Sequence, residues 1–223
     1  MIDQNGISQE SPLLDEKTRE TIRGVFQKLG RDVTLKAALD VKEPKSAEMA
    51  SFLKGIAALG ARVHLELYGA DEAAAQLKEF MDIKRLPVTG LFTGGTFTGA
   101  AFHGVPGGKE INSFVLGIYN AAGPGQELSK GAVKKIGKIR RPVHLKICVS
   151  LACHHCPGVV IACQRIAMLN PAVTAEMYDG GLYPDLVDAY HIERVPALIV
   201  NDRDVFLGPR GIEDLAQLCI DAR

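Results

Sequence analysis

The sequence predicts an α/β fold that contains two copies of one unit of strands and helices. Three observations favour this fold. Short apolar runs typical of strands alternate with longer stretches of helical period. The chain has 223 residues, enough for one or two domains with a sizeable core. Its halves also repeat each other at a constant spacing, and alternating strands and helices build a mostly parallel or mixed sheet covered on both faces.

The repeat emerges when the second half is laid on the first with a shift of 110 residues. A slip of one residue then aligns Pro87 with Pro196. The other matched residues are Val33, Leu35 and Lys36 with Val143, Leu145 and Lys146; Ile56, Ala57 and Leu59 with Ile166, Ala167 and Leu169; Val63, Glu66 and Tyr68 with Val173, Glu176 and Tyr178; and Ile83 and Arg85 with Ile192 and Arg194. A constant shift indicates a duplicated unit. We expect one unit at residues 1–122 and a second at residues 123–223.

Each predicted unit combines strands with helices and has a Gly-rich turn before its last helix. A leading helix at Glu16–Leu29 follows the start signal Ser11-Pro12. In the first unit, the periodicity predicts strands at Val33–Leu39, Val63–Leu67, Val88–Phe92 and Thr96–Phe102, and helices at Ala47–Leu59, Ala73–Met81 and Ile111–Ala121. In the second unit, it predicts strands at Val143–Val149, Val173–Tyr178 and Ala197–Asn201, and helices at Pro157–Leu169, Tyr183–Tyr190 and Ile212–Cys219. The segment 123–137 is expected to be a connection that contains a further helix.

The most informative motif is the pair Cys153 and Cys156, which lies where a predicted strand ends and a predicted helix begins. The unpaired N–H groups and the positive dipole end of a helix stabilise a thiolate, and the pKa of a cysteine at such a position falls to about 3.5–7.5. The C-x-x-C motif therefore predicts a redox-active dithiol. At the shift of 110 residues, the first unit has Glu43 and Ser46 at these positions, so it cannot exchange disulfides.

Pro196 follows Val195 and begins a predicted strand in the second unit. Proline lacks the N–H of a sheet ladder, and a cis Val195–Pro196 bond would form a tight corner against the dithiol. The backbone of Val195 would then be free to bind an extended substrate by strand addition. An ordinary edge proline is the alternative, and Pro87 in the unit without a dithiol is compatible with it. We expect Val195 and Pro196 to bind substrate.

His154 and His155 lie between the two cysteines and allow three interpretations. As imidazolium groups they would favour a thiolate at Cys153, as ligands they would join the cysteines in a zinc site, and otherwise they are exposed turn residues. A zinc site needs four converging ligands, and the sequence has no second pair of C-x-x-C or H-x-H type. We therefore expect no metal, and we place both histidines on the substrate-binding surface.

The composition narrows the class of protein. Lys and Arg total 26, as do Asp and Glu, so no charge excess points to nucleic acid or to an anionic membrane. No apolar run approaches the ~20 residues of a membrane span, and the N-terminus lacks a secretory signal. Five cysteines do not suggest a secreted disulfide framework, so we expect a cytoplasmic location. Cys148, Cys163 and Cys219 lie in apolar patterns and are expected to be buried, unreactive thiols.

Three short runs carry a family resemblance, and they are Cys153-His154-His155-Cys156-Pro157, Leu169-Asn170-Pro171 and Asp179-Gly180-Gly181. Together they resemble the N-terminal domain of the flavoprotein subunit of bacterial alkyl hydroperoxide reductase, from Leu13 to the C-terminus. The resemblance implies two fused thioredoxin-like units, each a mixed central sheet with helices on both faces, with a dithiol only in the second unit. In that family, the domain passes electrons from a flavin module to a peroxiredoxin.

The resemblance also implies roles for three residues. The first cysteine attacks and the second resolves, which assigns these steps to Cys153 and Cys156. A glutamate of the unit without a dithiol lies beside them, which corresponds to Glu110. Thioredoxin-like proteins usually place a buried carboxylate six residues before the first cysteine, where this chain has Ile147, so a base must come from elsewhere. The alternative role for Glu110 is a charge at a helix start, as for Glu213 in the second unit.

We therefore expect a cytoplasmic dithiol–disulfide oxidoreductase that relays electrons from a flavoprotein reductase to a peroxiredoxin or another disulfide-bearing protein. No G-x-G-x-x-G run opens a helix after a strand, so no cofactor is expected in this chain. FAD and NADPH are expected on a thioredoxin-reductase-like partner or on a missing module, which makes the chain a free-standing carrier or an excised domain. The alternatives are a general protein disulfide reductase or isomerase, whose two-unit members usually carry a dithiol in both halves, and a zinc-binding adaptor.

Overall fold

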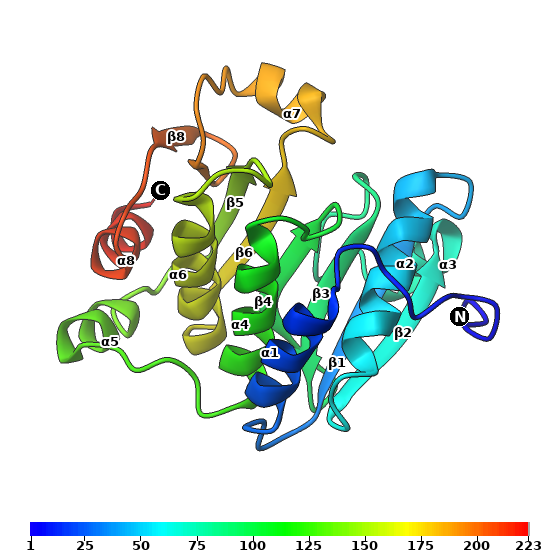
Figure 1. Ribbon diagram of the computed structural model, residues 1–223. Helices are drawn as coiled ribbons and strands as arrows, with labels where there is room; N and C mark the ends of the chain where they lie inside the picture. The colour runs from blue at the N-terminus through cyan, green and yellow to red at the C-terminus, as the bar shows by residue number, and fades with distance from the viewer. Residues whose placement is uncertain (223) are drawn as a thin grey trace.

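The structure is a computed structural model that describes residues 1–222, without the side chain of Ala74 (Figure 1). The strands are β1 (Val33–Leu39), β2 (Val63–Gly69), β3 (Val88–Thr93), β4 (Thr96–His103), β5 (Val143–Val149), β6 (Val173–Asp179), β7 (Ala197–Val200) and β8 (Asp204–Leu207). The helices are α1 (Glu16–Phe26), α2 (Pro44–Ala57), α3 (Ala70–Gln76), α4 (Glu110–Ala122), α5 (Lys130–Ile136), α6 (Cys156–Leu169), α7 (Pro184–Ala189) and α8 (Ile212–Asp221). None of the described helices is long and apolar enough to cross a membrane.

These strands form one sheet in the order β2-β1-β3-β4-β6-β5-β7-β8. Strands β1 to β4 make up one half of the sheet and β5 to β8 the other. In both halves the first strand runs parallel to the second and antiparallel to the third. The halves join where β4 runs parallel to β6. The expected α/β fold with a duplicated unit is therefore confirmed.

Helices cover both faces of this sheet. In Figure 1, α1, α2, α4 and α6 stand in front of it and α3 lies behind it. The large core lies beneath the front helices and includes a row of aromatic rings, in which Phe114 of α4 packs against Phe52 of α2 and Phe102 of β4. Two smaller apolar clusters lie on the other face, one that includes Ala73 of α3 and one that includes Leu186 of α7. The sheet is therefore buried from both sides, as its mixed topology requires.

Local signals explain where the helices begin. Asp15 caps α1 by accepting a hydrogen bond from the Thr18 N–H at 2.7 Å. Ser129 caps α5 in the same way, by accepting from the Ala132 N–H at 3.0 Å, so the connection after α4 contains the expected helix. Proline lies in the first turn of α2 and α6, where its missing N–H is not needed. The predicted boundary between residues 122 and 123 falls where α4 ends, and it stays a prediction.

Two predicted elements need correction. The helix expected at Ala73–Met81 is α3, which ends at Gln76 because Leu77 leaves the helical region with φ −123°. The side chains of Leu77 and Met81 are buried behind the sheet, although neither residue is helical. Their spacing of four residues is the same as that of apolar residues on one helix face, which explains the wrong prediction. Strand β8 was not predicted. Asn201 and Asp202 have φ values of 52° and 58°, and these two residues are typical of a hairpin turn, so a signal for β8 was present.

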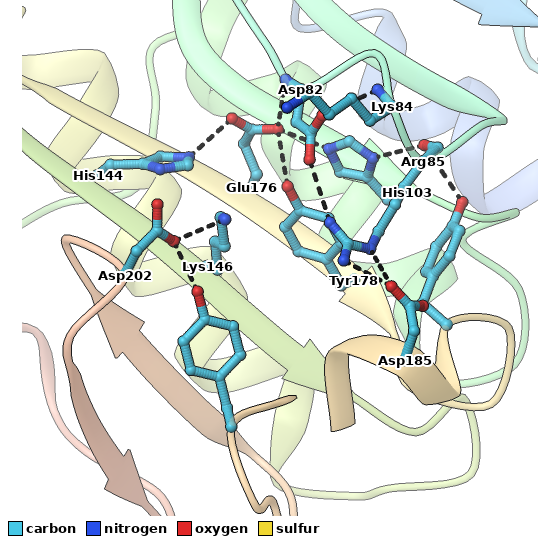
Figure 2. A network of polar contacts seen from close by, with 12 residues as sticks. Asp82, Lys84, Arg85, His103, His144, Lys146, Glu176, Tyr178, Asp185 and Asp202 are labelled. Atoms are coloured by element: carbon cyan, nitrogen blue, oxygen red, sulfur yellow. Dashed lines mark hydrogen bonds and ion pairs between the residues drawn. The ribbon is translucent and has the colours of Figure 1, made fainter. Parts of the chain in front are cut away.

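A buried carboxylate fastens the seam between the two halves (Figure 2). Glu176 of β6 is 2% exposed and accepts hydrogen bonds from His103 Nε2 of β4 at 2.6 Å and His144 Nε2 of β5 at 2.8 Å. The Asp82 N–H donates to the same carboxylate at 3.1 Å, and the Tyr178 hydroxyl does so at 3.3 Å. Burial opposes ionisation of Glu176, but the hydrogen bonds from His103 and His144 lower the pKa of its carboxyl well below the usual range. Glu176 is therefore a charged group inside the protein.

The geometry around His103 sets its charge. Its Nδ1 lies 2.9 Å from the carbonyl oxygen of Arg85, and its Nε2 lies against the Glu176 carboxylate. Both neighbours only accept hydrogen bonds, so both ring nitrogens donate and the imidazole is positively charged. Its ring also stacks on Tyr178, with centroids 4.0 Å apart. A buried ion pair between β4 and β6 thus bridges the two halves of the chain.

We predict that Glu176→Gln destabilises the protein by about 3–5 kcal/mol, because it leaves the buried charge of His103 unpaired. The free energy of unfolding in urea measures this loss. Glu66→Gln is the matched control from the first half. Glu66 pairs with Lys36 at 2.9 Å, but its side chain is 33% exposed, so about 1 kcal/mol or less should be lost. Equal losses for the two variants would contradict a special role for Glu176.

The pH dependence of the free energy of unfolding, compared between wild type and Glu176→Gln, adds a second test. The pKa of Glu176 is lower in the folded chain than in the unfolded chain. Its contribution to stability is therefore complete above the unfolded value of about 4.3 and is lost as the pH falls further. The difference in unfolding free energy between wild type and Glu176→Gln should shrink in acid, below about pH 4.

Candidate redox site

The dithiol lies where β5 ends and α6 begins. Cys153 and Cys156 form a disulfide with their Cα atoms 5.6 Å apart, and the backbone N–H of Cys156 donates to Cys153 Sγ at 3.1 Å. Cys156 is fully buried as the first residue of α6, whereas Cys153 is half-buried in the loop before it. The two sulfurs therefore differ in access, and Cys153 is the one that an incoming thiol or disulfide can reach.

The remaining cysteines are buried, as expected. Burial raises the pKa of the Cys148 thiol to about 12, and the charge of Asp179 adds to this effect. Burial also raises the pKa of Cys219 to about 12 and that of Cys163 well above its usual value. A buried thiol that stays protonated is a poor nucleophile, so Cys153 is the one chemically accessible cysteine of the described chain.

The turn before β7 lies beside the dithiol loop. Strands β5 and β7 pair with Cys148 opposite Ala197, which places Pro196 level with Val149 at the end of β5. The Val195–Pro196 bond is cis, and β7 has neighbours on both sides, so Pro196 is not an edge proline. Within residues 1–222, the backbone N–H and C=O of Val195 make no hydrogen bond, which leaves both groups open. This turn offers the features expected of a surface for strand addition.

The matching turn of the first half differs in its contacts with the other half, although the backbone of Leu86 there, like that of Val195, makes no hydrogen bond within residues 1–222. Its Leu86–Pro87 bond is also cis, but the hydroxyl of Tyr183 from the second half donates to the Pro87 carbonyl at 3.2 Å. Ser46, which matches Cys156, is buried, and its Oγ accepts from the Asp40 N–H at 3.0 Å. The first half therefore keeps the shape of the unit, and Ser46, which matches a cysteine of the redox site, makes a structural contact.

Glu110 is the first residue of α4 and is fully buried. The Ser113 hydroxyl donates to its Oε2, whereas its Oε1 has no hydrogen-bond partner among the described residues. Burial raises the pKa of the Glu110 carboxyl to about 7, the Ser113 hydrogen bond opposes this rise, and the charge of Asp179 adds to it. Glu213 lies in the first turn of α8 but is only partly buried and accepts from the Ser129 hydroxyl at 2.6 Å. A helix-end charge alone therefore does not explain the burial of Glu110.

The turn that precedes Glu110 docks on the dithiol loop. The Lys109 N–H donates to the Leu151 carbonyl at 2.9 Å, two residues before Cys153. Gly108 has φ 55°, and a Cβ there would lie 2.4 Å from the same carbonyl oxygen, so only glycine fits. The first half thus brings a buried carboxyl to the neighbourhood of the dithiol of the second half.

His154 and His155 are both exposed, and His155 is the residue before α6. Among the described residues, no group of three His, Cys, Asp or Glu side chains is arranged to hold a metal ion. The assignment of both histidines to substrate binding stays a prediction.

Asp179 is a residue of this region that the sequence reasoning did not assign. It ends β6 opposite Val149, and its Oδ1 accepts from the Gly181 N–H at 3.0 Å. Burial raises the pKa of its carboxyl. The matching position of the first half is Gly69, so the acidic residue occurs only in the half with the dithiol. This difference between the two copies is the sequence signal that marks Asp179 as a residue of the redox site.

Comparison with known proteins places this geometry in a family. Residues 143–217 match the thioredoxin domain family. The structure resembles the crystal structure of the NTD_N/C domain of alkylhydroperoxide reductase AhpF from Enterococcus faecalis, with a TM-score of 0.87. The two sequences are 36% identical, and the match covers 92% of this chain and 99% of that one. The chain belongs to the family of the AhpF N-terminal domain. A redox dithiol on this fold makes it a thiol–disulfide oxidoreductase.

Further matches of the chain are consistent with this family assignment. The chain is 28% identical over 203 residues to the AhpF protein of Pseudomonas aeruginosa, a component of its alkyl hydroperoxide reductase, and 25% identical over 203 residues to a Bacillus subtilis protein named NADH dehydrogenase. These matches cover 91% of the chain but only 36% and 37% of the two relatives. A protein disulfide oxidoreductase from Aeropyrum pernix has the same fold, with a TM-score of 0.82 at 20% identity over 93% of this chain and 92% of that one.

We predict that iodoacetamide modifies Cys153 first in the reduced protein. The pKa of this thiol should lie below the ~8.5 of a free cysteine, because the helix start stabilises its thiolate. Mass spectrometry of the alkylated chain, sampled over time and pH, identifies the modified cysteines. Cys148, Cys163 and Cys219 serve as internal controls that should react only after unfolding. Modification of any of them at the rate of Cys153 would overturn the assignment.

Proposed function

We propose that this protein relays electrons from a thioredoxin-reductase-like flavoprotein to the disulfide of a peroxiredoxin or a similar protein. The observation that carries the proposal is the unequal access of the two sulfurs, with Cys153 open and Cys156 buried behind it. The kinship with the AhpF N-terminal domain supports the choice of donor and acceptor. FAD and NADPH would belong to the donor, since this chain has no dinucleotide fingerprint.

The exchange has two steps that balance in electrons and protons. The Cys153 thiolate attacks one sulfur of the substrate disulfide, a mixed disulfide forms, and the other substrate sulfur leaves as a thiolate. Cys156, once deprotonated, then attacks Cys153 Sγ, and the second substrate thiolate leaves. The substrate disulfide has gained two electrons, and the Cys153–Cys156 disulfide has formed. The flavoprotein returns the dithiol to its reduced form.

The substrate would bind across the turn before β7. Its extended segment would pair with the open N–H and C=O of Val195, which places its disulfide beside Cys153. Pro196 shapes this turn, and the exposed His154 and His155 would line the approach. The corresponding turn of the first half has no dithiol beside it, and its Pro87 carbonyl already accepts a hydrogen bond from Tyr183 of the second half.

Glu110 would accept the proton of Cys156. Ile147 occupies the position at which thioredoxin-like proteins usually have their own buried carboxylate. The pKa of Glu110 near 7 keeps both its acid and its base form populated at neutral pH, which suits a group that takes up a proton and returns it. The first half would then supply the general base and the second half both thiols.

The proposed relay predicts that Cys156→Ser forms a trapped adduct. The serine cannot attack the mixed disulfide, so the substrate should stay bound to Cys153. Incubation of the reduced variant with an oxidised peroxiredoxin should give a covalent complex on non-reducing gels, and Cys153→Ser should give none. Full multiple turnover by Cys156→Ser would exclude the dithiol mechanism. A useful control is NADPH with the wild-type chain alone, which should not be oxidised until a flavoprotein reductase is added.

We further predict that Glu110→Gln slows the reduction of a disulfide substrate by about 10²–10⁴-fold, the usual loss for a general base. The wild-type rate should rise with pH through about 7, as Glu110 loses its proton, and this rise should be absent in the variant. Stopped-flow measurements of single-turnover oxidation between pH 5.5 and about 8.5 test both points. Glu213→Gln is the matched helix-start control and should keep the wild-type rate. Equal rates in the two variants would reduce Glu110 to a structural residue.

A further inference from the structure

A cavity of about 390 Å³ lies at the seam between the halves. Strand β4 pairs with β6 only from Ala100 to His103, so its first residues, Thr96 to Gly99, leave β6 and open a space. Gly99 has φ 83°, and a Cβ there would come within 2.8 Å of the Val173 carbonyl oxygen. Residues of both halves line the cavity, among them Arg31, Phe97, Arg165, Met168, Leu169 and Thr174.

The cavity is positively charged. Arg31 and Arg165 line it, no Asp or Glu does, and neither arginine has an ion pair within residues 1–222. Asp32, which follows Arg31 in the sequence, forms an ion pair with Arg62 at 3.3 Å and not with Arg31. Arg31 is exposed to solvent and Arg165 is half-buried, so water or a bound anion compensates the two charges.

The two guanidinium groups keep unused donors. Arg31 Nε donates to the Ala121 carbonyl at 2.8 Å, which leaves both Nη groups without an acceptor among the described residues. Arg165 donates from Nη1 to the Asn120 carbonyl at 3.2 Å and from Nη2 to the Gln126 carbonyl at 3.1 Å. Each Nη group carries two hydrogens, so one remains on each Nη of Arg165. Part of each arginine thus holds the end of α4, and the rest is available to a ligand.

From this arrangement we propose that the cavity binds a phosphate group. The planar donor fork of arginine fits the oxygens of phosphate, and two arginines balance a doubly charged anion. The hydroxyls of Thr96 and Thr174 add donors on the lining. Phe97, Met168 and the 45% exposed Leu169 form an apolar wall that would contact the organic part of a phosphate ester.

This site is separate from the redox site. Thr174 lies at the start of β6, which is parallel to β5, and the dithiol follows the end of β5. The cavity therefore opens at the opposite end of the sheet. A bound phosphate group would contact both halves of the chain and so stabilise their contact, without touching either cysteine.

Calorimetric titration of the full chain with inorganic phosphate and with phenyl phosphate, against chloride at equal ionic strength, tests the proposal. We expect saturable binding with one site per chain. Arg31→Gln should weaken it at least tenfold. Because Arg31 also holds α4, Thr174→Glu provides a second variant that keeps both arginines and places a carboxylate beside them, and it should abolish binding. Arg62→Gln, an exposed arginine outside the cavity, should bind as wild type does.

The outcomes separate the sources of the phosphate group. Tighter binding of phenyl phosphate would identify a phosphate ester that uses the apolar wall, and equal binding would identify free phosphate. The proposal is overturned if neither probe binds above the chloride control. It is equally overturned if Thr174→Glu and Arg31→Gln bind both probes as wild type does. Reduction of a disulfide substrate should proceed at the wild-type rate in all three variants, because the cavity lies away from the dithiol.

Discussion

A carboxylate without water is stable only when donors surround it, and Glu176 finds its donors on both sides of the seam. His103 and the Asp82 N–H come from the first half, and His144 and Tyr178 come from the second. Neither half alone supplies all the hydrogen-bond donors around the Glu176 carboxylate, so the buried charge holds β4 beside β6. The same alignment brings the turn before α4 onto the dithiol loop. The geometry of the redox site therefore depends on a polar cluster on another part of the sheet.

The periodicity and the repeat predicted most of the fold, because both are local signals that survive in a single sequence. The dithiol was equally visible as a motif. The role of Glu176 was not, since Glu66 occupies the matching position with similar neighbours. The two glutamates differ only because β2 is an edge strand and β6 lies in the middle of the sheet. Burial of Glu110 also depends on a contact between the halves, which no local pattern encodes.

The two halves have put the same turn to different uses. Before β3, the turn is covered by the second half: Arg85 pairs with Asp185 at 2.6 Å, and Tyr183 donates to the Pro87 carbonyl. The backbone of Val195 before β7 and that of Leu86 before β3 both lack a hydrogen bond within residues 1–222, so the turns differ in their contacts with the other half. The turn before β3 thus contacts the neighbouring half, whereas the turn before β7 has no hydrogen bond or ion pair to the first half among the described residues. A duplicated unit can divide structure and chemistry in this way, because each task needs only one of the two surfaces.

The parallel pairing of β4 with β6 limits how such a chain can be shortened. In the complete sheet, the only unpaired edges among the described strands belong to β2 and to the short β8. A fragment made of the second half alone would expose the edge of β6 from Ala175 to Tyr178, which pairs with β4 in the complete chain, and would uncover Glu176. An edge of that kind recruits further strands and leads to aggregation. The half without cysteines therefore covers a sheet edge of the half that carries them and keeps that edge from pairing with other chains.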